Sequence, residues 1–429
     1  MIFTYLNVNK ILDYFNVTLL LLLIFFNYLI YFILDTKSYF IFFSILILST
    51  FLIILFKNLK SNFYIVLILL LMLLISLGSP VADWDARSIW LFNAKRIFYN
   101  QNLASYTNYL GSEFSHLDYP ILIQTLSASL ATLIGKWNEV FPKISSIIFA
   151  LPAMLVISKI IKNNLDKLIL MILIFFIYEK KLINGEMDAL LGLYAISSVI
   201  LILNFLKLKK IFFKDYLKIF LFISSLTMIK IEGLGIFLCL FITYLIVYYN
   251  YKNKTHNHLI IVFFISLLPI VTWKTFIYDQ NIVASSQLML SGGDRLFKNL
   301  LDFKFLLILI KHIILNKPMF ISLLLFLIFL SKYISFNKNE TDIELDKYIF
   351  SKEIIFIIIT FTLYGTLLVL IFIMSEGSPN NFFEIKYFMT TSSADRLFIP
   401  VHSLIITCSI YLNKKTKKQK NLFYKIINF

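Results

Sequence analysis

A succession of long apolar segments constrains this chain more than any other feature. Twelve segments are long enough, or nearly so, to cross a hydrocarbon core about 30 Å thick. They lie at 17–34, 38–56, 63–80, 140–158, 168–183, 188–206, 216–229, 234–250, 259–277, 318–331, 353–374 and 397–412. The 429 residues are 59% hydrophobic and 15% charged, whereas soluble domains are roughly 45–50% apolar and about 25% charged. The sequence therefore predicts an all-α, polytopic membrane protein and excludes a soluble multidomain enzyme.

Lysine-rich loops set the expected orientation, because cytoplasmic loops of membrane proteins carry an excess of basic residues. The loops that we place inside are 57–62, 159–167, 207–218, 251–258, 332–352 and the tail 413–429. Two further apolar runs, 119–135 and 301–316, cannot both cross without moving a lysine-rich loop to the other side. We therefore expect them to be juxtamembrane or re-entrant helices on the outer face. The result is about twelve spans with both termini inside, and the net charge of +16 calls for no nucleic-acid partner.

The predicted outer loops carry charged residues that the insertion signal does not explain. All four arginines of the chain fall on this face, where the positive-inside rule would not place them. A planar guanidinium binds phosphate or carboxylate with two parallel hydrogen bonds. The outer loops at 81–139, 180–187, 230–233, 278–317 and 375–396 are too short for a separate soluble domain, so any chemistry must take place at the membrane surface. Their charged and titratable residues include Asp83, Asp85, Arg87, Lys95, Arg96, His116, Asp118, Glu186, Asp188, Lys230, Glu232, Arg295, Asp395 and Arg396.

Each of these residues also has a purely structural interpretation. Asp85 and Asp188 could cap the helices that follow them. Lys230 could extend its ammonium group to the interface, and Arg87 and Lys95 could face lipid headgroups. Together, however, several short loops bring acids and bases near membrane depth, where ionisable groups are costly and usually functional.

A metal centre is a weaker hypothesis than a proton-transfer site. The four carboxylates at Asp83, Asp85, Glu186 and Asp188 could hold a divalent cation, since hard cations prefer oxygen ligands. His116 has no second histidine at a metal-ligand spacing, and the chain lacks the glycine-rich loops that bind nucleotides. The sequence therefore predicts no definite cofactor, and a divalent cation is the alternative.

The order of these features resembles the GT-C superfamily of integral-membrane glycosyltransferases, which includes protein O-mannosyltransferases and aminoarabinose lipid A transferases. The features are an acidic first outer loop, an interfacial helix, a His-x-Asp-Tyr-Pro stretch, a second acidic turn, a Lys-x-Glu-Gly break and a late Arg-x-x-x-Pro span. The stretch from Trp84 to Trp90 is similar to the opening of uncharacterised bacterial members. The resemblance covers residues 63–412, a GT-C-like catalytic region, and leaves 1–62 as two additional N-terminal transmembrane helices.

The resemblance implies roles for nine residues. Asp85 matches the general base of the first outer loop, with Asp83 as the near alternative, because the double-acid pair of the family reads Asp-Trp-Asp here. Glu186 and Asp188 match the turn that positions the acceptor or a metal. Lys230 and Arg396 match basic positions that would face the donor phosphate. Arg87, Lys95 and His116 are weaker matches to such positions.

The implied activity is transfer of a sugar from a polyprenyl-phosphate donor to an envelope glycolipid, glycan or protein acceptor. The protein would be a multi-pass enzyme of the cytoplasmic membrane, with its active site facing the periplasm or exterior. The alternative is a transporter or flippase for a lipid-linked or anionic substrate, which would favour two repeated halves with half-helices broken near the bilayer midplane. No such repeat is visible in the sequence.

Overall fold

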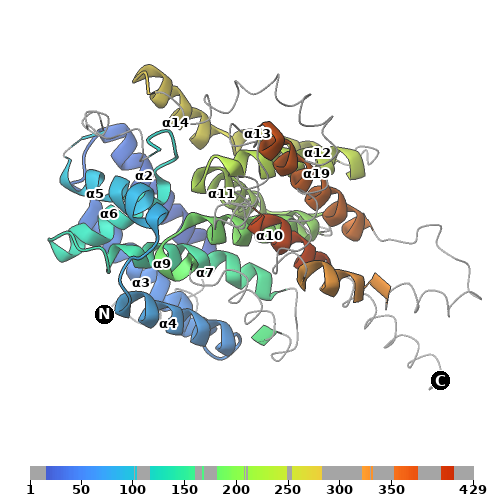
Figure 1. Cartoon of the computed structure of the whole chain (residues 1–429), viewed down its shortest axis with the longest axis horizontal. Helices are drawn as coiled ribbons and strands as arrows, with labels where there is room; N and C mark the ends of the chain where they lie inside the picture. The colour runs from blue at the N-terminus through green and yellow to red at the C-terminus, as the bar shows by residue number, and fades with distance from the viewer. Residues whose placement is uncertain are drawn as a thin grey trace, which may run out of the picture. The chain divides into compact units, whose positions relative to one another are not determined.

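The computed structural model describes the parts of the chain that hold most of the candidate site (Figure 1). Every regular element in these parts is a helix, in agreement with the predicted all-α class. Arg396 and Arg295 lie outside them. The described residues are 16–100, 102–103, 116–159, 167–168, 181–206, 208, 211–248, 254–282, 321–328, 330–331, 352–374 and 398–409.

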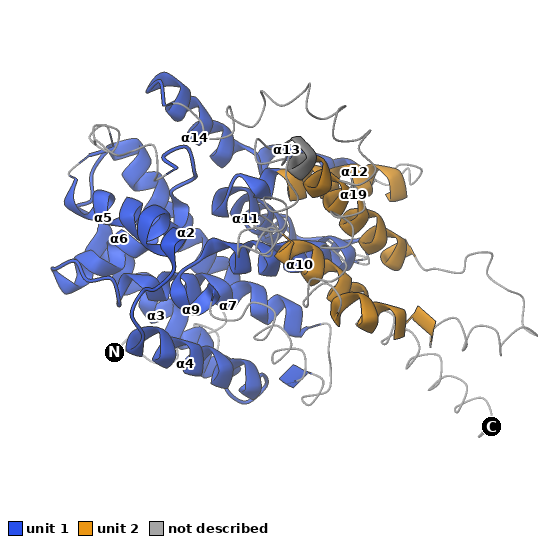
Figure 2. Cartoon of the chain, viewed as in Figure 1, with its two compact units in different colours: residues 1–234, 257–285 blue, residues 235–256, 286–429 orange. Residues whose placement is uncertain are grey.

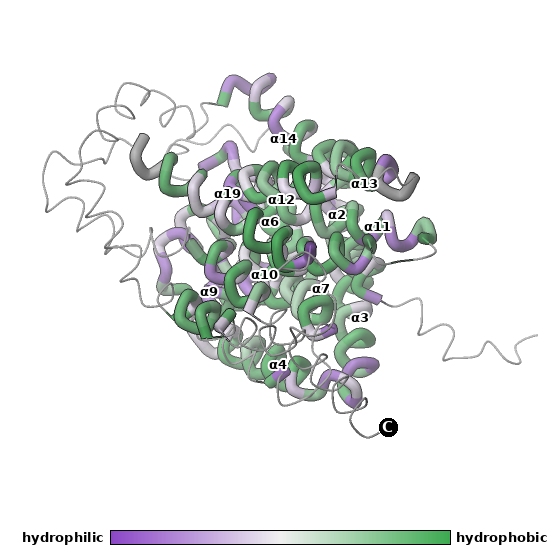
Figure 3. Tube along the Cα trace, turned by 90° about the vertical axis from the view of Figure 1, so that its right-hand side faces the viewer, coloured by the Kyte–Doolittle hydropathy of each residue, from purple (hydrophilic) through white to green (hydrophobic). Residues whose placement is uncertain are grey.

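Five of the described helical segments are long and apolar enough to cross a membrane: α2 (Val17–Leu34), α3 (Phe40–Asn58), α10 (Met187–Phe205), Asn257–Asp279 and Lys352–Leu370 within α19 (Lys352–Met374). Shorter apolar helices cover Phe63–Gly78, Leu122–Ile134, Pro142–Ser158, Glu232–Tyr248 and Ile399–Ser409. Figure 3 shows apolar residues along most of these helices. The membrane class is thus supported by several helices, whereas the number twelve stays a prediction.

The span expected at 259–277 is found as one membrane-length helical segment, Asn257–Asp279, with a short turn at its middle. α13 (Lys254–Ile265) ends before Ser266, and α14 (Leu268–Asp279) begins after Leu267. The turn covers Ser266 and Leu267, just before α14. Pro269 lies in the first turn of α14, where its missing backbone N–H is tolerated.

The chain divides into two compact units (Figure 2). The first comprises residues 1–234 and 257–285, and the second comprises 235–256 and 286–429. In the second unit, α19 passes close to the start of α12 (Glu232–Tyr248), where a methyl group added at Gly235 would lie 3.0 Å from the Leu367 side chain. All the candidate site residues that the structure describes belong to the first unit.

Helix α10 forms the centre of the first unit. It is apolar all round, which is typical of a helix buried on every side, and 94% of its membrane-span window is buried. It packs against α7 (Ser145–Ser158) and α11 (Phe213–Ile229). The Tyr194 hydroxyl donates to the Phe149 carbonyl over 2.9 Å, and the two rings stack with centroids 4.7 Å apart.

The first two helices pack into the same unit. α6 (Leu122–Ile134), within the run expected to be juxtamembrane or re-entrant, contacts α2, α3 and α5 (Leu91–Tyr99). The Ser129 hydroxyl of α6 donates to the Asn27 amide oxygen of α2 over 2.9 Å. Ten of the thirteen residues of α6 are buried, so α6 forms part of the core of the first unit.

A tight break joins α11 to α12 and brings Lys230 and Glu232 together. α11 ends at Ile229, Lys230 is extended at φ −160° and ψ 154°, and α12 begins at Glu232. Gly233 donates its backbone N–H to the Lys230 carbonyl over 2.9 Å. A Cβ atom at Gly233 would lie only 2.0 Å from the Leu226 carbonyl oxygen, so a side chain at position 233 would force the two helix ends apart.

We expect Gly233→Ala to lower the amount of folded protein sharply. Backbone, rather than a flexible side chain, blocks the new methyl group, and overpacking of this kind costs about 1–3 kcal/mol or more. Thermal unfolding of the detergent-purified protein measures the effect. The matched control is Gly78→Ala, where nothing lies within 4 Å of the added methyl group; equal unfolding temperatures for the two variants would contradict this account of the break.

Candidate functional site

The first outer loop leads from α4 (Phe63–Gly78) into a π-helical turn, Ala86–Trp90, and then into α5. Such turns occur mostly as short bulges and frequently at functional sites. The backbone N–H of Arg87 donates to the Asp83 carbonyl over 3.1 Å. The side chain of Asn184 donates to the Asp83 carboxylate. Asp83 therefore connects the first outer loop to the second acidic turn.

Asp85 does not act as a helix cap through its side chain. Its backbone is helical, at φ −62° and ψ −40°, and its carboxylate makes no capping hydrogen bond to the helix that follows. The side chain is half-buried, whereas those of Arg87 and Lys95 are exposed. Arg96, one residue beyond Lys95, is buried with 4% of its surface exposed.

The second acidic turn is held by hydrogen bonds from two neighbouring helices. It consists of α9 (Lys181–Asn184), a left-handed Gly185 at φ 85°, and Glu186, which precedes α10. Two serine hydroxyls donate to carbonyls of α9, Ser76 to Ile183 over 3.0 Å and Ser146 to Leu182 over 2.8 Å. These bonds fix the start of α10, where Glu186 is the N-cap residue and Asp188 lies in the first turn.

Lys230 lies between two carboxylates. Its Nζ is 2.9 Å from Asp188 Oδ1 and 3.1 Å from Glu232 Oε1. Asp188 is in the first turn of α10 and Lys230 follows the last residue of α11, so the antiparallel pairing of these helices brings them together. Burial disfavours the ammonium form, but the attraction of Asp188 and Glu232 outweighs it and raises the pKa of Lys230 well above its usual value. Lys230 therefore stays charged, and its ion pair with Asp188 joins the start of α10 to the end of α11.

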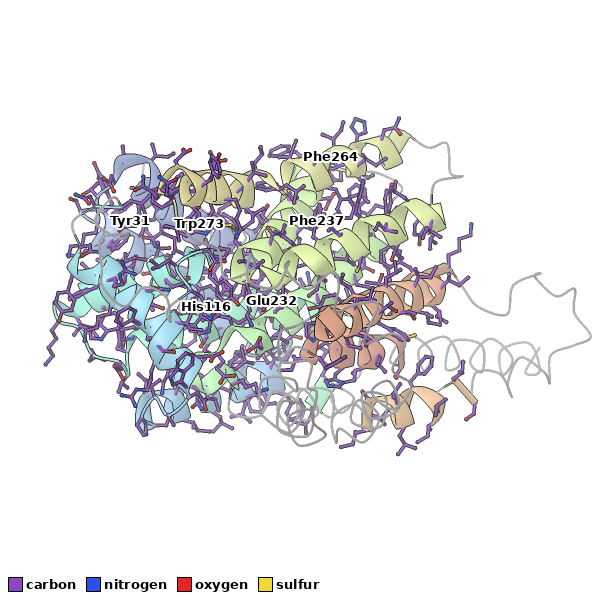
Figure 4. The ribbon with its side chains drawn as sticks, turned by 45° about the horizontal axis from the view of Figure 1, so that its top comes forward. Tyr31, His116, Glu232, Phe237, Phe264 and Trp273 are labelled. Carbon is purple, nitrogen blue, oxygen red and sulfur yellow. The ribbon has the colours of Figure 1, made fainter. Side chains whose placement is uncertain are left out.

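Three aromatic rings extend from this ion triad. Lys230 Nζ is 5.9 Å from the centroid of the Tyr119 ring. Tyr119 stacks on His116, with centroids 5.0 Å apart and planes at 15°, and on Trp90, at 5.4 Å and 20°. Figure 4 marks His116 and Glu232, which stand at the two ends of this set of contacts. The π-helical turn, the His116 segment and the α11–α12 break thus meet at one place.

A second ion pair supports the His116 segment from α14. The Trp273 indole N–H donates to the Asp118 carbonyl over 3.0 Å, and Lys274 Nζ lies 3.9 Å from Asp118 Oδ2. Asp118 is 1% exposed. His116 adopts a left-handed backbone at φ 46°, a conformation uncommon for residues other than glycine and often found at functional positions.

The structure brings several of the expected residues together. Asp83 is joined to the second acidic turn, Asp188 to Lys230, and His116 to the same cluster through Tyr119. Arg87 and Lys95 are exposed on the first loop.

Sequence reasoning did not give a role to Glu232, Asp118, Tyr119 or Lys274. The signal for Lys274 was available, because a lysine interrupts the apolar run 259–277. A basic residue within such a run tends to pair with an acid, and Asp118 is that acid here. The sequence gives no indication that Lys230 forms ion pairs with both Glu232 and Asp188. The two carboxylates come close to this lysine only when the helix ends pack together.

The residues present do not fit a divalent-cation site. Among the residues that the structure describes, no group of three or more His, Cys, Asp and Glu side chains gathers closely enough to hold a metal ion. Asp188 is bound to Lys230 and Asp83 to Asn184. No chemical step is therefore assigned to a metal.

Comparison with protein families, curated proteins and solved structures finds no match to this chain. The first loop supplies half-buried carboxylates and exposed cations, and the ion triad supplies a fixed buried charge beside aromatic rings. Such an arrangement can accept a proton, bind an anion and orient a polyhydroxylated ligand.

The turn between α2 and α3 holds α5 in place. The Lys37 ammonium donates to the Phe98 carbonyl and lies 5.2 Å from the centroid of the Phe98 ring. The Tyr31 hydroxyl donates to the Asn102 carbonyl over 3.4 Å. These contacts connect the N-terminal helices to the helix that follows the candidate base.

We expect Lys37→Met to loosen α5 without unfolding the protein. The hydrogen bond and the cation–π contact together contribute about 1 kcal/mol, so amide exchange in α5 should quicken about fivefold where exchange follows local opening. Hydrogen–deuterium exchange with mass spectrometry measures this change. Lys60→Met, at an exposed position, is the control, and unchanged exchange in α5 of Lys37→Met would contradict the assignment.

Proposed function

We propose that the protein is a membrane glycosyltransferase of the GT-C type. In this proposal it has twelve spans, with both termini in the cytoplasm and the site on the outer face of the cytoplasmic membrane. It moves a sugar from a polyprenyl-phosphate donor to an envelope glycolipid, glycan or protein. The observation that carries the proposal is the convergence of three short inter-helix segments on one buried ion triad. Ionisable groups at membrane depth are energetically unfavourable and usually have a function.

The reaction that we propose is a single inverting displacement. The Asp85 carboxylate takes the proton of the acceptor hydroxyl, whose oxygen then attacks the anomeric carbon of the sugar. The bond between that carbon and the phosphate oxygen breaks, and polyprenyl phosphate leaves with the electron pair. Asp83 is the alternative base. Its hydrogen bond from Asn184 supports instead a positioning role that ties the base-bearing loop to the second acidic turn.

The donor phosphate requires cations where its negative charge develops. Arg87 and Lys95 are exposed on the loop that carries Asp85, and a guanidinium forms paired hydrogen bonds with phosphate oxygens. The resemblance adds Arg396 to this group. A lipid-linked donor needs no nucleotide-binding loop, and the sequence contains no such motif.

Envelope glycans and glycolipids from a gene deletion test the proposal. Mass spectrometry should show the loss of one sugar from one class of molecule, with restoration by the wild-type gene. If the deletion strain lacks no sugar but accumulates a lipid-linked precursor on the inner leaflet, the result would instead support the transporter. An identical profile in all strains would contradict a transferase.

A further inference from the structure

Lys230 is already balanced by acidic groups of the protein. Asp188 and Glu232 both lie within 3.1 Å of its Nζ, so the three side chains together carry a net charge of −1. A phosphate at Lys230 would face two carboxylates at close range, and at such distances like charges repel strongly in a partly buried site. The triad therefore suits a neutral hydrogen-bond donor better than an anion.

Glu232 has an oxygen that is ready to accept a hydrogen bond. Its Oε1 is held by Lys230, whereas its Oε2 is buried and has no hydrogen-bond partner among the residues that the structure describes. The Oε2 atom is covered, whereas the side chain as a whole keeps 22% of its surface exposed, so a ligand hydroxyl reaches Oε2 when the carboxylate turns toward its exposed edge. An ionised carboxylate only accepts hydrogen bonds, and leaving such an oxygen buried without a donor is unfavourable.

The surroundings of Glu232 narrow the class of ligand. The Lys230 ammonium that holds it also lies over the Tyr119 ring, which stacks with Trp90 and His116. Sites with aromatic walls and a few fixed polar groups bind organic ligands in one orientation. The phosphomonoester of a sugar-free polyprenyl phosphate is mostly deprotonated at neutral pH and is a poor donor to Oε2, whereas a sugar ring has several hydroxyls.

We infer that Glu232 accepts a hydrogen bond from a hydroxyl of the lipid-linked sugar and so distinguishes the loaded donor from sugar-free polyprenyl phosphate. The inference rests on the proposed function and adds the residue that recognises the sugar. Lys230 and Asp188 fix the orientation of Glu232, and the tight Gly233 turn sets its distance from Lys230.

Lipid capture by the full-length protein in nanodiscs tests the inference. The probe is the polyprenyl-phosphate fraction extracted from cells that lack the gene, mixed with sugar-free undecaprenyl phosphate. Mass spectrometry of the bound lipids gives the ratio of loaded to sugar-free lipid. We expect Glu232→Gln to lower this ratio about tenfold, since a hydrogen bond to a charged acceptor is replaced by a weaker one. Binding of the sugar-free lipid should stay within about twofold of wild type.

Two further variants separate the possible outcomes. Glu139→Gln, an exposed acid of the same unit, should keep the wild-type ratio, and Arg87→Gln should weaken both lipids equally. An unchanged ratio in Glu232→Gln would overturn the inference and leave the proposed function intact. Equal loss of both lipids in Glu232→Gln would show a structural role and also overturn it. If the wild type captures neither lipid, the proposed function fails together with the inference.

Discussion

Asp85→Asn should abolish sugar transfer and leave the protein folded. The substitution removes the proposed proton acceptor but keeps the size of the side chain, and a positioned general base contributes about 10²–10⁴-fold to rate. The carboxylate makes no capping hydrogen bond to its helix, so loss of its charge removes no helix cap. Product formation per folded molecule, measured by mass spectrometry in a complemented deletion strain, checks the prediction.

Asp83→Asn and Asp279→Asn are the matched comparisons for this experiment. Asp279 is an exposed residue at the end of α14, and its substitution should have no effect. Asp83→Asn should lower activity less than Asp85→Asn does, because an amide oxygen still accepts the hydrogen bond from Asn184. Full activity in Asp85→Asn together with loss in Asp83→Asn would transfer the role of base to Asp83.

Lys230→Met should have the largest effect on stability. It leaves Asp188 and Glu232 near one another without the cation between them, and breaking a buried ion pair by removing one partner costs about 3–5 kcal/mol. We expect a large drop in unfolding temperature of the purified protein. Adding Asp188→Asn to Lys230→Met should recover part of the loss, since it removes one of the two uncompensated charges.

The pH dependence provides a second check on Lys230. Its pKa in the folded protein lies above its usual value because Asp188 and Glu232 outweigh the effect of burial. Stability from the ion triad is therefore fully present below the unfolded pKa, about 10.4, and is lost only as pH rises through the higher folded pKa. Lys136→Met, at an exposed position, is the control. A wild-type unfolding temperature in Lys230→Met would contradict the role of the triad.

Hydrophobic segmentation was sufficient to predict the helical class and several membrane-length helices. It also placed Asp188 and Lys230 on short loops at neighbouring helix ends, and the antiparallel packing of α10 and α11 explains why they meet. The span expected at 259–277 is found as one membrane-length helical segment, Asn257–Asp279. The short turn at Ser266 within it was not predicted, because apolar length alone gives no sign of a local break.

The contacts that define the candidate site could not be predicted from sequence, because they depend on side-chain geometry. The stacking of His116 on Tyr119 requires the left-handed backbone of His116, which no local motif specifies. The shared use of Lys230 by two acids requires the close approach at Gly233. A glycine after Lys-x-Glu indicates a turn but not what the turn brings together.

In the proposed reaction this chain breaks the bond between a sugar and a polyprenyl phosphate. The most direct test uses purified protein in lipid vesicles that contain the donor fraction from deletion cells and an envelope acceptor extract. Mass spectrometry should find one new sugar on one acceptor for each sugar-free polyprenyl phosphate released, with Asp85→Asn giving neither product. Movement of an intact donor across the vesicle membrane, without release of polyprenyl phosphate, would rule out a transferase and establish a transporter.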